Sequence, residues 1–512
     1  MTARTQEKSD WLLAGGLAVA TLLSRLPFRS QLLYEHDSFL FARAMQRYSV
    51  AEGRPHPPGY LFYVMAARLM NGLVHDPNAA LVGVNILFSA LGAAGCYFLA
   101  RRLWGRSAGL AAGLLFAASP LVWFHGDIAL IYATAGALAA LVMLGCFRLA
   151  DGQRGWAIPT ALLLGVSGGF WTWVTIFLFP AWVYAASRGG WRRAATGLVW
   201  VLVGALTWYL PNAVLAGGIG AFQRLLSTYG RPVIVHGLLT GWQWPRSGPT
   251  AVNIGRWIWA AAQLALVPLG YLAVRGAVQA ARGRFRSGRE AWLFGLWIGP
   301  ALLFYLFIYV DRPGYILIFA PALLILAAGG LVALGQDLWS AARGRAARSG
   351  SARYLILLLI ALAAVDNAIA FAYRPSDFSA EKIDAHDRVL KAKIDFVESF
   401  LPGETVVLAS DEAAAAEYYL YEQAGYEVRN ASFNQRTLAA PGTPGPAERV
   451  VRYVILFDDQ LLDYDRSPGE VRWRELIPGT GTMIGYFELA PGQRFVLRPG
   501  EFWVETAAGA SP

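Results

Sequence analysis

A short acidic segment directly after the first apolar stretch carries the residues best suited to chemistry, Glu35-His36-Asp37. A carboxylate placed just outside a membrane helix can remove the proton of a bound hydroxyl, and a positioned general base contributes about 10²- to 10⁴-fold in rate. Asp37 is the residue of this segment whose position would suit such chemistry. The competing interpretation is structural, because the free N–H groups and the dipole of a following helix would also stabilise Asp37 as an N-cap.

The residues after Asp37 predict a helix that lies in the membrane interface. Between Ser38 and Tyr48 the polar side chains fall at helical spacing and the other positions are mostly apolar. A Pro-Pro break follows within His56-Pro57-Pro58-Gly59-Tyr60. Loops between helices are usually short and polar, so this longer segment is expected to build a site. Its basic and aromatic candidates for substrate binding are His36, Arg43, Arg47, Arg54, His56 and Tyr60.

The composition is that of a membrane protein. Hydrophobic residues make up 56% of the chain and charged residues 15%, whereas a soluble domain has about 25% charged residues. The mean hydropathy is +0.41. The net charge of +10 could indicate a nucleic-acid partner, but the basic residues lie mostly in short clusters beside apolar stretches, as the positive-inside rule requires. We therefore expect no nucleic-acid partner.

Apolar stretches of membrane-spanning length recur through the first 375 residues. A basic N-terminus without a small-residue cleavage site predicts that the first stretch is an uncleaved span. About eleven spans are expected in all, and the fifth is short enough to be re-entrant or tilted. Their approximate ranges are 11–23, 79–99, 107–123, 128–149, 156–166, 170–186, 194–216, 251–274, 291–310, 314–334 and 354–371.

The distribution of arginine predicts the orientation. Clusters within 101–106, 148–154, 188–193, 275–289 and 343–353 all fall on one side if every stretch crosses the membrane. The positive-inside rule makes that side the inner one. The N-terminus is then inside and the C-terminus outside, and the expected location is a bacterial inner membrane.

The first loop resembles that of the polytopic glycosyltransferases of the C-type fold (GT-C), which use polyprenyl-phosphate sugars and include protein mannosyltransferases and aminoarabinose transferases. The resemblance rests on the acid in the first outer loop, on two interfacial helices and on the segment from His56 to Tyr60. It implies the GT-C fold and makes Asp37 the catalytic base. It also implies a second site acid in the second outer loop, where Asp127 stands in the segment from Ser119 to Tyr132. An N-cap role is the alternative for Asp127 as well.

Two further segments bear on the resemblance. The segment from Asp311 to Tyr315 is similar to the family segment whose basic residue faces the lipid phosphate, so Arg312 and Tyr315 join the substrate-binding candidates, as does His125 beside Asp127. Several relatives have an arginine after a Gly-Gly-Phe sequence, whereas this chain has Trp171 after Phe170. That departure puts one phosphate contact in doubt.

No cofactor is expected. Five histidines in or beside the predicted outer loops could hold a divalent cation together with Asp37 and Asp127, and such a cation is the alternative. No pair of these residues shows a metal-ligand spacing. The histidines are His36, His56, His75, His125 and His236.

After Pro375 the composition becomes that of a soluble domain. A helical apolar stripe is followed by a strand at 405–409, a helix at 413–423, a strand at 450–457 and a hairpin formed by 483–488 and 494–497. The residues of the stripe are Leu390, Ile394, Val397 and Leu401. We therefore predict a transmembrane domain over residues 1–375 and a small extracytoplasmic α/β domain over 376–512. The latter has no Gly-rich phosphate loop, so its expected role is to cover the outer surface or help choose the acceptor.

These features predict a membrane glycosyltransferase that moves a hexosyl or pentosyl group from a polyprenyl-phosphate carrier to an acceptor hydroxyl of a protein, lipid or glycan on the outer side. One base without a partnered nucleophile favours inversion at the anomeric carbon. The alternative is a polytopic transporter or lipid flippase, although transporters tend to show internal repeats and charges near the midplane. A non-catalytic scaffold with an outer sensing domain would leave the first loop unexplained.

Overall fold

The computed structural model describes residues 3–240, 244–282, 288–343 and 349–507. The chain divides into two compact units. We call the first the helical unit, which comprises Met1–Ser30 and Leu40–Ile383. We call the second the mixed unit, which comprises Gln31–Phe39 and Asp384–Pro512. The short segment that carries Asp37 therefore belongs to the same unit as the C-terminal part of the chain.

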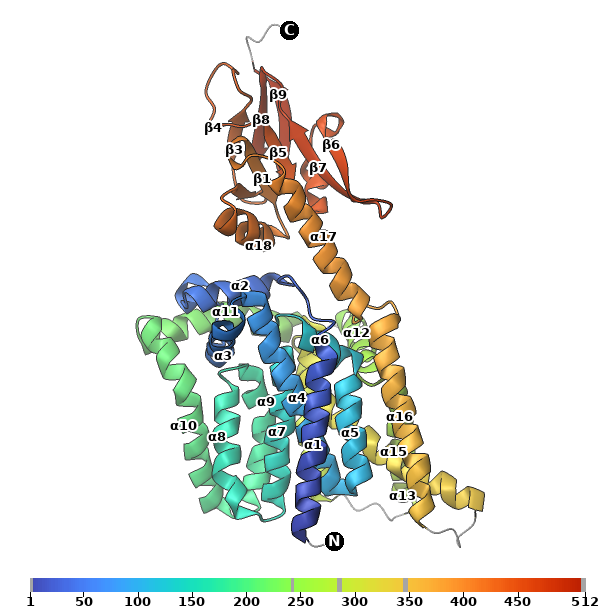
Figure 1. Ribbon diagram of the computed structural model, residues 1–512. Coiled ribbons are helices and arrows are strands. Elements are labelled where there is room, and N and C mark those ends of the chain that lie inside the picture. The colour runs from blue at the N-terminus through green and yellow to red at the C-terminus, as the bar shows by residue number, and fades with distance from the viewer. Residues whose placement is uncertain (1–2, 241–243, 283–287, 344–348, 508–512) are drawn as a thin grey trace. The chain divides into compact units, whose positions relative to one another are not determined.

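Long apolar helices build the helical unit (Figure 1). Helix α2 (His36–Gln46) begins in the mixed unit and continues into the helical unit. The other helices and turns of the helical unit are α1 (Ala3–Arg25), η1 (Val50–Glu52), α3 (Leu61–Val74), α4 (Pro77–Trp104), α5 (Arg106–Ala118), α6 (Pro120–Asp127), α7 (Tyr132–Ala150), η2 (Arg154–Trp156), α8 (Ala157–Ser167), α9 (Thr172–Ser187), α10 (Trp191–Leu215), α11 (Ile219–Thr240), α12 (Trp244–Ala262), η3 (Gln263–Ala265), α13 (Leu266–Ala281), α14 (Arg289–Phe307), η4 (Pro313–Ile318), α15 (Ala320–Arg343) and α16 (Ser349–Tyr373).

Helix α4 packs against α1, α3, α5 and α7 and so forms the centre of the helical unit. Helices α8 and α10 approach each other closely at Gly165, where a Cβ atom would overlap the carbonyl oxygen of Val201. The Trp208 Nε1–H donates to the Gly165 carbonyl oxygen over 3.0 Å at the same crossing. Small residues let helix backbones meet in this way inside a membrane.

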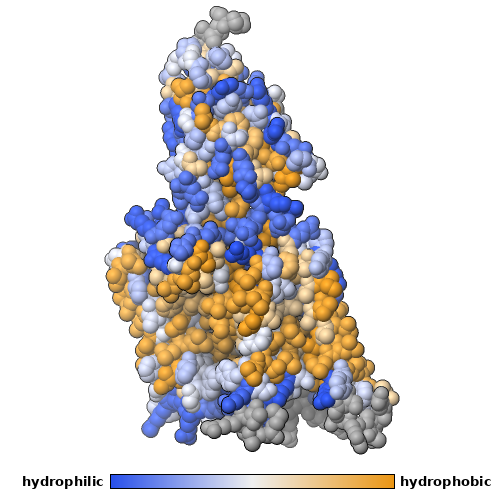
Figure 2. Space-filling view, in the orientation of Figure 1, coloured by the Kyte–Doolittle hydropathy of each residue, from blue (hydrophilic) through white to orange (hydrophobic). Residues whose placement is uncertain are grey.

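Seven helices in the described part of the chain are long and apolar enough to cross a membrane, or eight if the bent pair α5 and α6 is one span. The bend between these two helices is 53°. Each of the eleven predicted stretches is largely helical, but 107–123 and 251–274 are each divided between two helices and 314–334 begins in the turn η4. The number of spanning helices is smaller than the eleven predicted spans for two reasons. Helix α1 carries several charged residues, and α8 and α9, at 11 and 16 residues, are shorter than a span. Figure 2 shows hydrophobic residues gathered in a band over these helices, so the chain is an integral membrane protein.

Two β-sheets form the core of the mixed unit, and α17 (Ala380–Glu398) leads into it. One sheet has the order β2-β1-β5-β7-β6, with β1 parallel to β2 and β5, and the other has the order β4-β3-β8-β9. The strands and helical turns are η5 (Pro402–Glu404), β1 (Thr405–Ala409), α18 (Ala413–Ala416), the π-helix η6 (Glu417–Gln423), β2 (Glu427–Asn430), β3 (Arg436–Ala439), β4 (Arg449–Val450), β5 (Tyr453–Leu456), η7 (Asp459–Tyr464), η8 (Pro468–Glu470), β6 (Arg472–Ile477), β7 (Thr482–Glu488), β8 (Gln493–Arg498) and β9 (Glu501–Thr506).

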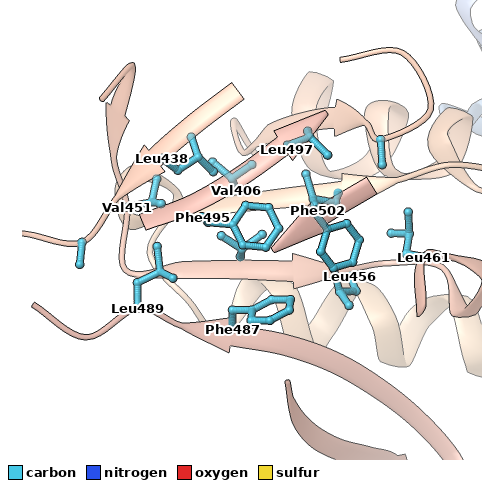
Figure 3. Packing of buried hydrophobic residues seen from close by; sticks show 14 residues of the cluster. Val406, Leu438, Val451, Leu456, Leu461, Phe487, Leu489, Phe495, Leu497 and Phe502 are labelled. Carbon is cyan, nitrogen blue, oxygen red and sulfur yellow. The ribbon is translucent and has the colours of Figure 1, made fainter. Parts of the chain in front are cut away.

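Apolar side chains from both sheets form one buried cluster (Figure 3). Val406 and Phe487 come from the first sheet, and Phe495 and Phe502 come from the second. The ring centroids of Phe487 and Phe495 are 5.2 Å apart. The two sheets therefore share a single core, as expected for packed layers.

The predicted hairpin of residues 483–488 with 494–497 is wrong. Strand β7 pairs with β5 and β6, whereas β8 pairs with β3 and β9. The turn that begins at Ala490, whose carbonyl oxygen accepts the N–H of Gln493 over 2.9 Å, leads from one sheet to the other. Leu401, which was expected in the apolar stripe of the preceding helix, follows the end of α17 and is exposed.

Candidate functional site

Asp37 is the second residue of α2 and is half-buried. The Glu35 N–H donates to the Ser38 Oγ over 3.2 Å, and the Ser38 N–H donates to the Glu35 carbonyl oxygen over 2.8 Å. The Ser38 side chain thus makes the N3 half of a capping box with Glu35 in the cap position, whereas the second bond is a backbone turn. Asp37 is thus not the N-cap of α2. It lies in the first turn, where the positive end of the helix dipole favours a carboxylate.

The predicted site residues are divided between the two units. His36, which is exposed, and Asp37 lie in the mixed unit, and the other nine lie in the helical unit. Asp37 and the residues of the helical unit are therefore described separately below.

The segment from His56 to Tyr60 is ordered by contacts within the helical unit. His56 Nε2 and the Tyr60 hydroxyl are 2.9 Å apart and share a hydrogen bond. The His56 ring also stacks on Tyr229, with the centroids 5.0 Å apart. Tyr60 is buried and its ring meets the edge of Phe41. These contacts fix the side chains of two predicted substrate-binding residues.

The backbone of the same segment needs a glycine at position 59. Gly59 has a φ of 106°, and a Cβ atom there would lie 2.5 Å from the Tyr48 hydroxyl. That hydroxyl donates to the Gly59 carbonyl oxygen over 2.7 Å. The side-chain amide of Asn212 on α10 donates to the Pro58 carbonyl oxygen over 3.3 Å. Asn212 is fully buried, and its role could not be predicted because Asn212 lies in an apolar helix that is remote in the chain.

An aromatic cluster brings further predicted residues together. The Tyr315 ring is 5.0 Å from Trp171 and 5.8 Å from Tyr132, and Tyr132 is 5.1 Å from His125. The structure therefore joins Tyr315 and His125 through Tyr132, whereas His56 and Tyr60 form a separate pair.

Trp171 occupies the place where several relatives would have an arginine. It is almost fully buried, and its ring also meets Tyr132, with the centroids 5.4 Å apart. In this chain the position after the Gly-Gly-Phe sequence thus contributes an aromatic face instead of a positive charge. Any phosphate contact must come from another residue.

Asp127 is the last residue of α6 and is fully buried. It is not the N-cap of the next helix, because α7 begins at Tyr132 with Ile131 as its cap. Neither carboxylate oxygen has a hydrogen-bond partner among the described residues. The nearest compensating charge is Arg25, which is also fully buried and interacts with Asp127 electrostatically.

Arg25 was missed by sequence reasoning, because an arginine at the end of an apolar stretch is usually explained by snorkelling. Its Nη2 donates to the Ala117 carbonyl oxygen over 2.9 Å, and its guanidinium lies 5.0 Å from the centre of the Trp123 ring. A Cβ atom at Gly126 would lie 2.9 Å from the Arg25 Nε. The glycine beside Asp127 thus makes room for this arginine.

The predicted arginines differ in their surroundings. The Arg47 side chain is 70% exposed and forms an ion pair with Glu52 over 2.8 Å. The Arg312 side chain is 48% exposed and pairs with Asp311 over 3.2 Å. Surface pairs of this kind contribute little, about 0 to 1 kcal/mol. Arg43 and Arg54 are half-buried.

Among the described residues, no group of three or more His, Cys, Asp or Glu side chains is placed to hold a metal ion. Cys96 and Cys146 are both buried within helices. His236 lies outside the residues whose side chains the structure describes. The alternative of a divalent cation stays a prediction.

Comparison with known proteins places this architecture in a fold family. Residues 48–192 match the family model for the N-terminal domain of protein O-mannosyl-transferase TMEM260. No curated protein matches the chain. The solved structures that resemble it include ArnT from Cupriavidus metallidurans in the apo state, at 15% identity and a TM-score of 0.53, with 95% of this chain and 98% of that chain covered.

Two further structures support the same fold. ArnT from the same organism, bound to undecaprenyl phosphate, has 15% identity and a TM-score of 0.54, with 93% and 97% of the two chains covered. The apo oligosaccharyltransferase of Archaeoglobus fulgidus has 15% identity and a TM-score of 0.51, with 89% of this chain and 70% of that chain covered. These similarities confirm the polytopic helical fold that was predicted from the first loop.

Proposed function

Because this chain has the C-type (GT-C) fold of membrane glycosyltransferases, we propose that it transfers a hexosyl or pentosyl group from a polyprenyl-phosphate carrier to an acceptor hydroxyl. The observation that carries the proposal is Asp37, a half-buried acid in the first turn of α2 that the helix does not use as its cap. The ArnT structure with undecaprenyl phosphate supports a carrier of this chemical class.

In the proposed reaction Asp37 accepts the proton of the acceptor hydroxyl while the oxygen of that hydroxyl attacks the anomeric carbon of the donor. The bond between the anomeric carbon and the phosphate oxygen breaks, and polyprenyl phosphate leaves with the bonding electrons. A single displacement inverts the anomeric configuration. A base at this position contributes about 10²- to 10⁴-fold in rate.

The leaving phosphate requires positive charge. Arg312 directly precedes η4 and has a half-exposed side chain, and Arg43, Arg47 and Arg54 follow Asp37 in the chain. Each charge-assisted hydrogen bond to the phosphate would contribute roughly 1.5 to 3 kcal/mol. A planar guanidinium can bind two phosphate oxygens at once, which lysine cannot do.

The remaining predicted residues would bind the sugar or the acceptor. The hydrogen-bonded pair His56 and Tyr60 offers polar groups, and Tyr315 with its aromatic neighbours offers ring faces. His36 precedes Asp37 in the same helical turn. Asp127 is the second acid of the proposal, and its burial beside Arg25 means that its part in catalysis needs the separate test described in the Discussion.

The proposed location is a bacterial inner membrane, with the N-terminus inside and the acceptor site outside. The acceptor is a protein, a lipid or a glycan. The reaction as written uses only side chains of this protein and needs no cofactor.

The test uses the purified full-length chain in lipid nanodiscs with a panel of polyprenyl-phosphate sugars and hydroxyl acceptors, and it follows release of the sugar and the configuration of the product. Asp37→Asn should lower turnover at least about a hundredfold, while donor affinity stays the same. Asp76→Asn is a matched control, because Asp76 caps α4 by accepting the Ala79 N–H over 2.6 Å.

Near-normal turnover of the Asp37→Asn variant would exclude Asp37 as the base. A retained anomeric configuration would exclude the single displacement. If no sugar is released and the intact lipid instead crosses the membrane of proteoliposomes, the chain is a flippase.

A further inference from the structure

The segment before α2 is held by side chains from the C-terminal part of the mixed unit. The Gln31 N–H donates to Oδ2 of Asp387 over 2.6 Å, and the Leu32 N–H donates to Oδ1 of the same carboxylate over 3.3 Å. The Leu33 N–H donates to the Tyr419 hydroxyl over 2.9 Å. Three consecutive backbone N–H groups therefore have side-chain partners that come from much later in the chain.

Ring contacts hold the same segment on both sides of Asp37. The Tyr34 ring lies 4.3 Å from the His386 ring. After Asp37, the Phe39 ring lies 5.8 Å from Tyr418 and 5.9 Å from Tyr419. Leu33 and Phe39 are both almost fully buried, with 1% and 4% of their surface exposed. Asp37 thus lies between two anchored positions.

The side chains named above come from two elements of the mixed unit. Asp387 lies on α17, and Tyr418 and Tyr419 lie on the π-helix Glu417–Gln423. Short π-helical turns are rare and are often found at functional sites. Here the π-helix presents two adjacent tyrosines to one segment.

We propose that Asp387 and Tyr419 are positioning residues that hold the segment Gln31–Phe39, so that the C-terminal domain determines where the Asp37 carboxylate lies. This inference rests on the proposed function of Asp37 as the base. It gives the domain a direct part in catalysis, in addition to any part in choosing the acceptor.

The physical reason is the sensitivity of proton transfer to distance. A misplacement of about 1 Å at a reacting group can lower the rate about a hundredfold. Asp37 is four residues from Leu33 and two from Phe39, so loss of either anchor should let the backbone that carries its carboxylate shift. Loss of these contacts should lower kcat. It should leave the KM for the donor unchanged, because the proposed phosphate-binding arginines lie in the helical unit.

Conservative variants test the two residues separately. Tyr419→Phe removes the hydroxyl that accepts the Leu33 N–H and keeps the ring against Phe39. Asp387→Asn keeps the shape of the side chain and removes its charge and one acceptor oxygen. Matched controls are Tyr421→Phe, at an exposed position of the same π-helix, and Asp395→Asn, at an exposed position of the same α17.

The first measurement is amide hydrogen exchange of residues 31–39 in the full-length protein, which does not depend on activity. Exchange should become at least about fivefold faster in Tyr419→Phe and Asp387→Asn, because each variant removes a hydrogen bond and a fivefold change corresponds to about 1 kcal/mol, and it should not change in the controls. Unchanged exchange in both variants overturns the proposal that these residues hold the segment.

The second measurement is the steady-state kinetics of sugar transfer. We expect kcat to fall about tenfold in each variant, with the donor KM unchanged. The kcat of Asp387→Ala should fall further than that of Asp387→Asn. In the background of Asp37→Asn, the Asp387→Asn change should cause no further loss, since it acts through the base.

Faster exchange with an unchanged kcat overturns the positioning role. The role is also overturned if Asp387→Asn lowers kcat as much in the background of Asp37→Asn as it does alone. If the unmodified protein transfers no sugar, the proposed function fails. In that case the exchange data still decide whether Asp387 and Tyr419 hold the segment.

Discussion

Replacing Asp127 separates two roles for this acid, contact with substrate and compensation of a buried charge. Asp127 and Arg25 both have 0% of their surface exposed. Among the described residues, neither oxygen of Asp127 nor the Nε of Arg25 has a hydrogen-bond partner. In the described part of the chain the guanidinium contacts the Ala117 carbonyl oxygen, the adjacent Ser24 hydroxyl and the Trp123 ring, and it interacts electrostatically with Asp127.

The expected magnitude follows from this isolation. Removing one partner of a buried ion pair costs about 3 to 5 kcal/mol, because the other charge stays buried and unpaired. Replacing both partners by apolar residues of similar volume is often close to neutral. We therefore expect Asp127→Asn to lower the unfolding free energy by about 3 kcal/mol, and Arg25→Met combined with Asp127→Leu to restore most of it.

The assay is thermal unfolding of the full-length protein in one detergent, together with sugar transfer per folded molecule. If Asp127 serves mainly to compensate Arg25, the double variant recovers both stability and turnover. A double variant that is stable but inactive would refute this reasoning and favour contact between Asp127 and the substrate. Gly126→Ala is an independent check, because its Cβ would displace Arg25 without changing either charge.

Three further predictions concern other regions. Arg312→Ala should weaken use of the donor roughly ten- to a hundredfold, from the loss of about 1.5 to 3 kcal/mol, and Arg312→Lys should restore only part of the activity. The control is Arg188→Ala, at an exposed helix end. Full activity of the lysine variant would mean that Arg312 serves only as an interfacial anchor. Burial raises the pKa of Asp458 to about 6, so the folded chain binds this proton more tightly than the unfolded chain does. The unfolding free energy should therefore fall by up to about 3 kcal/mol as the pH rises from about 4 to about 6. Thermal unfolding across this range should lose that slope in Asp458→Asn, and an unchanged slope would contradict the assignment. Ser376→Cys, at an exposed position, should react with a membrane-impermeant thiol reagent in intact cells, and labelling only after lysis would overturn the predicted orientation.

The helices of the helical unit could be predicted from the sequence because their signal is local. An apolar run of about twenty residues has few alternatives in a membrane protein, and each predicted stretch is largely helical, although some are divided between two elements. The start of α2 at His36 was also within reach, since the acidic residues and the following periodicity mark a helix N-terminus. The bend at Ser119 accompanies a proline at the first position of α6, which the sequence also showed.

The anchoring of the Asp37 segment could not be predicted in the same way. The hydrogen bond from Gln31 to Asp387 joins residues 356 positions apart, and that from Leu33 to Tyr419 joins residues 386 apart. No periodicity or spacing in one sequence reports such a pairing. The pairing of β8 with β9, in contrast, could have been predicted from the sequence, because Pro499-Gly500 between two alternating strands is a local turn signal.

The structure distinguishes between two arginines after Asp37 that the sequence could not rank as phosphate-binding candidates. From the sequence, Arg47 and Arg54 were equivalent candidates for the phosphate. Arg47 is exposed and already paired with Glu52, whereas Arg54 is half-buried and its side chain has no hydrogen bond or ion pair to another residue in the described ranges. A partly desolvated guanidinium without a counter-charge is unfavourable until an anion binds. Arg54 is therefore the better candidate of the two for the leaving phosphate of the proposed reaction.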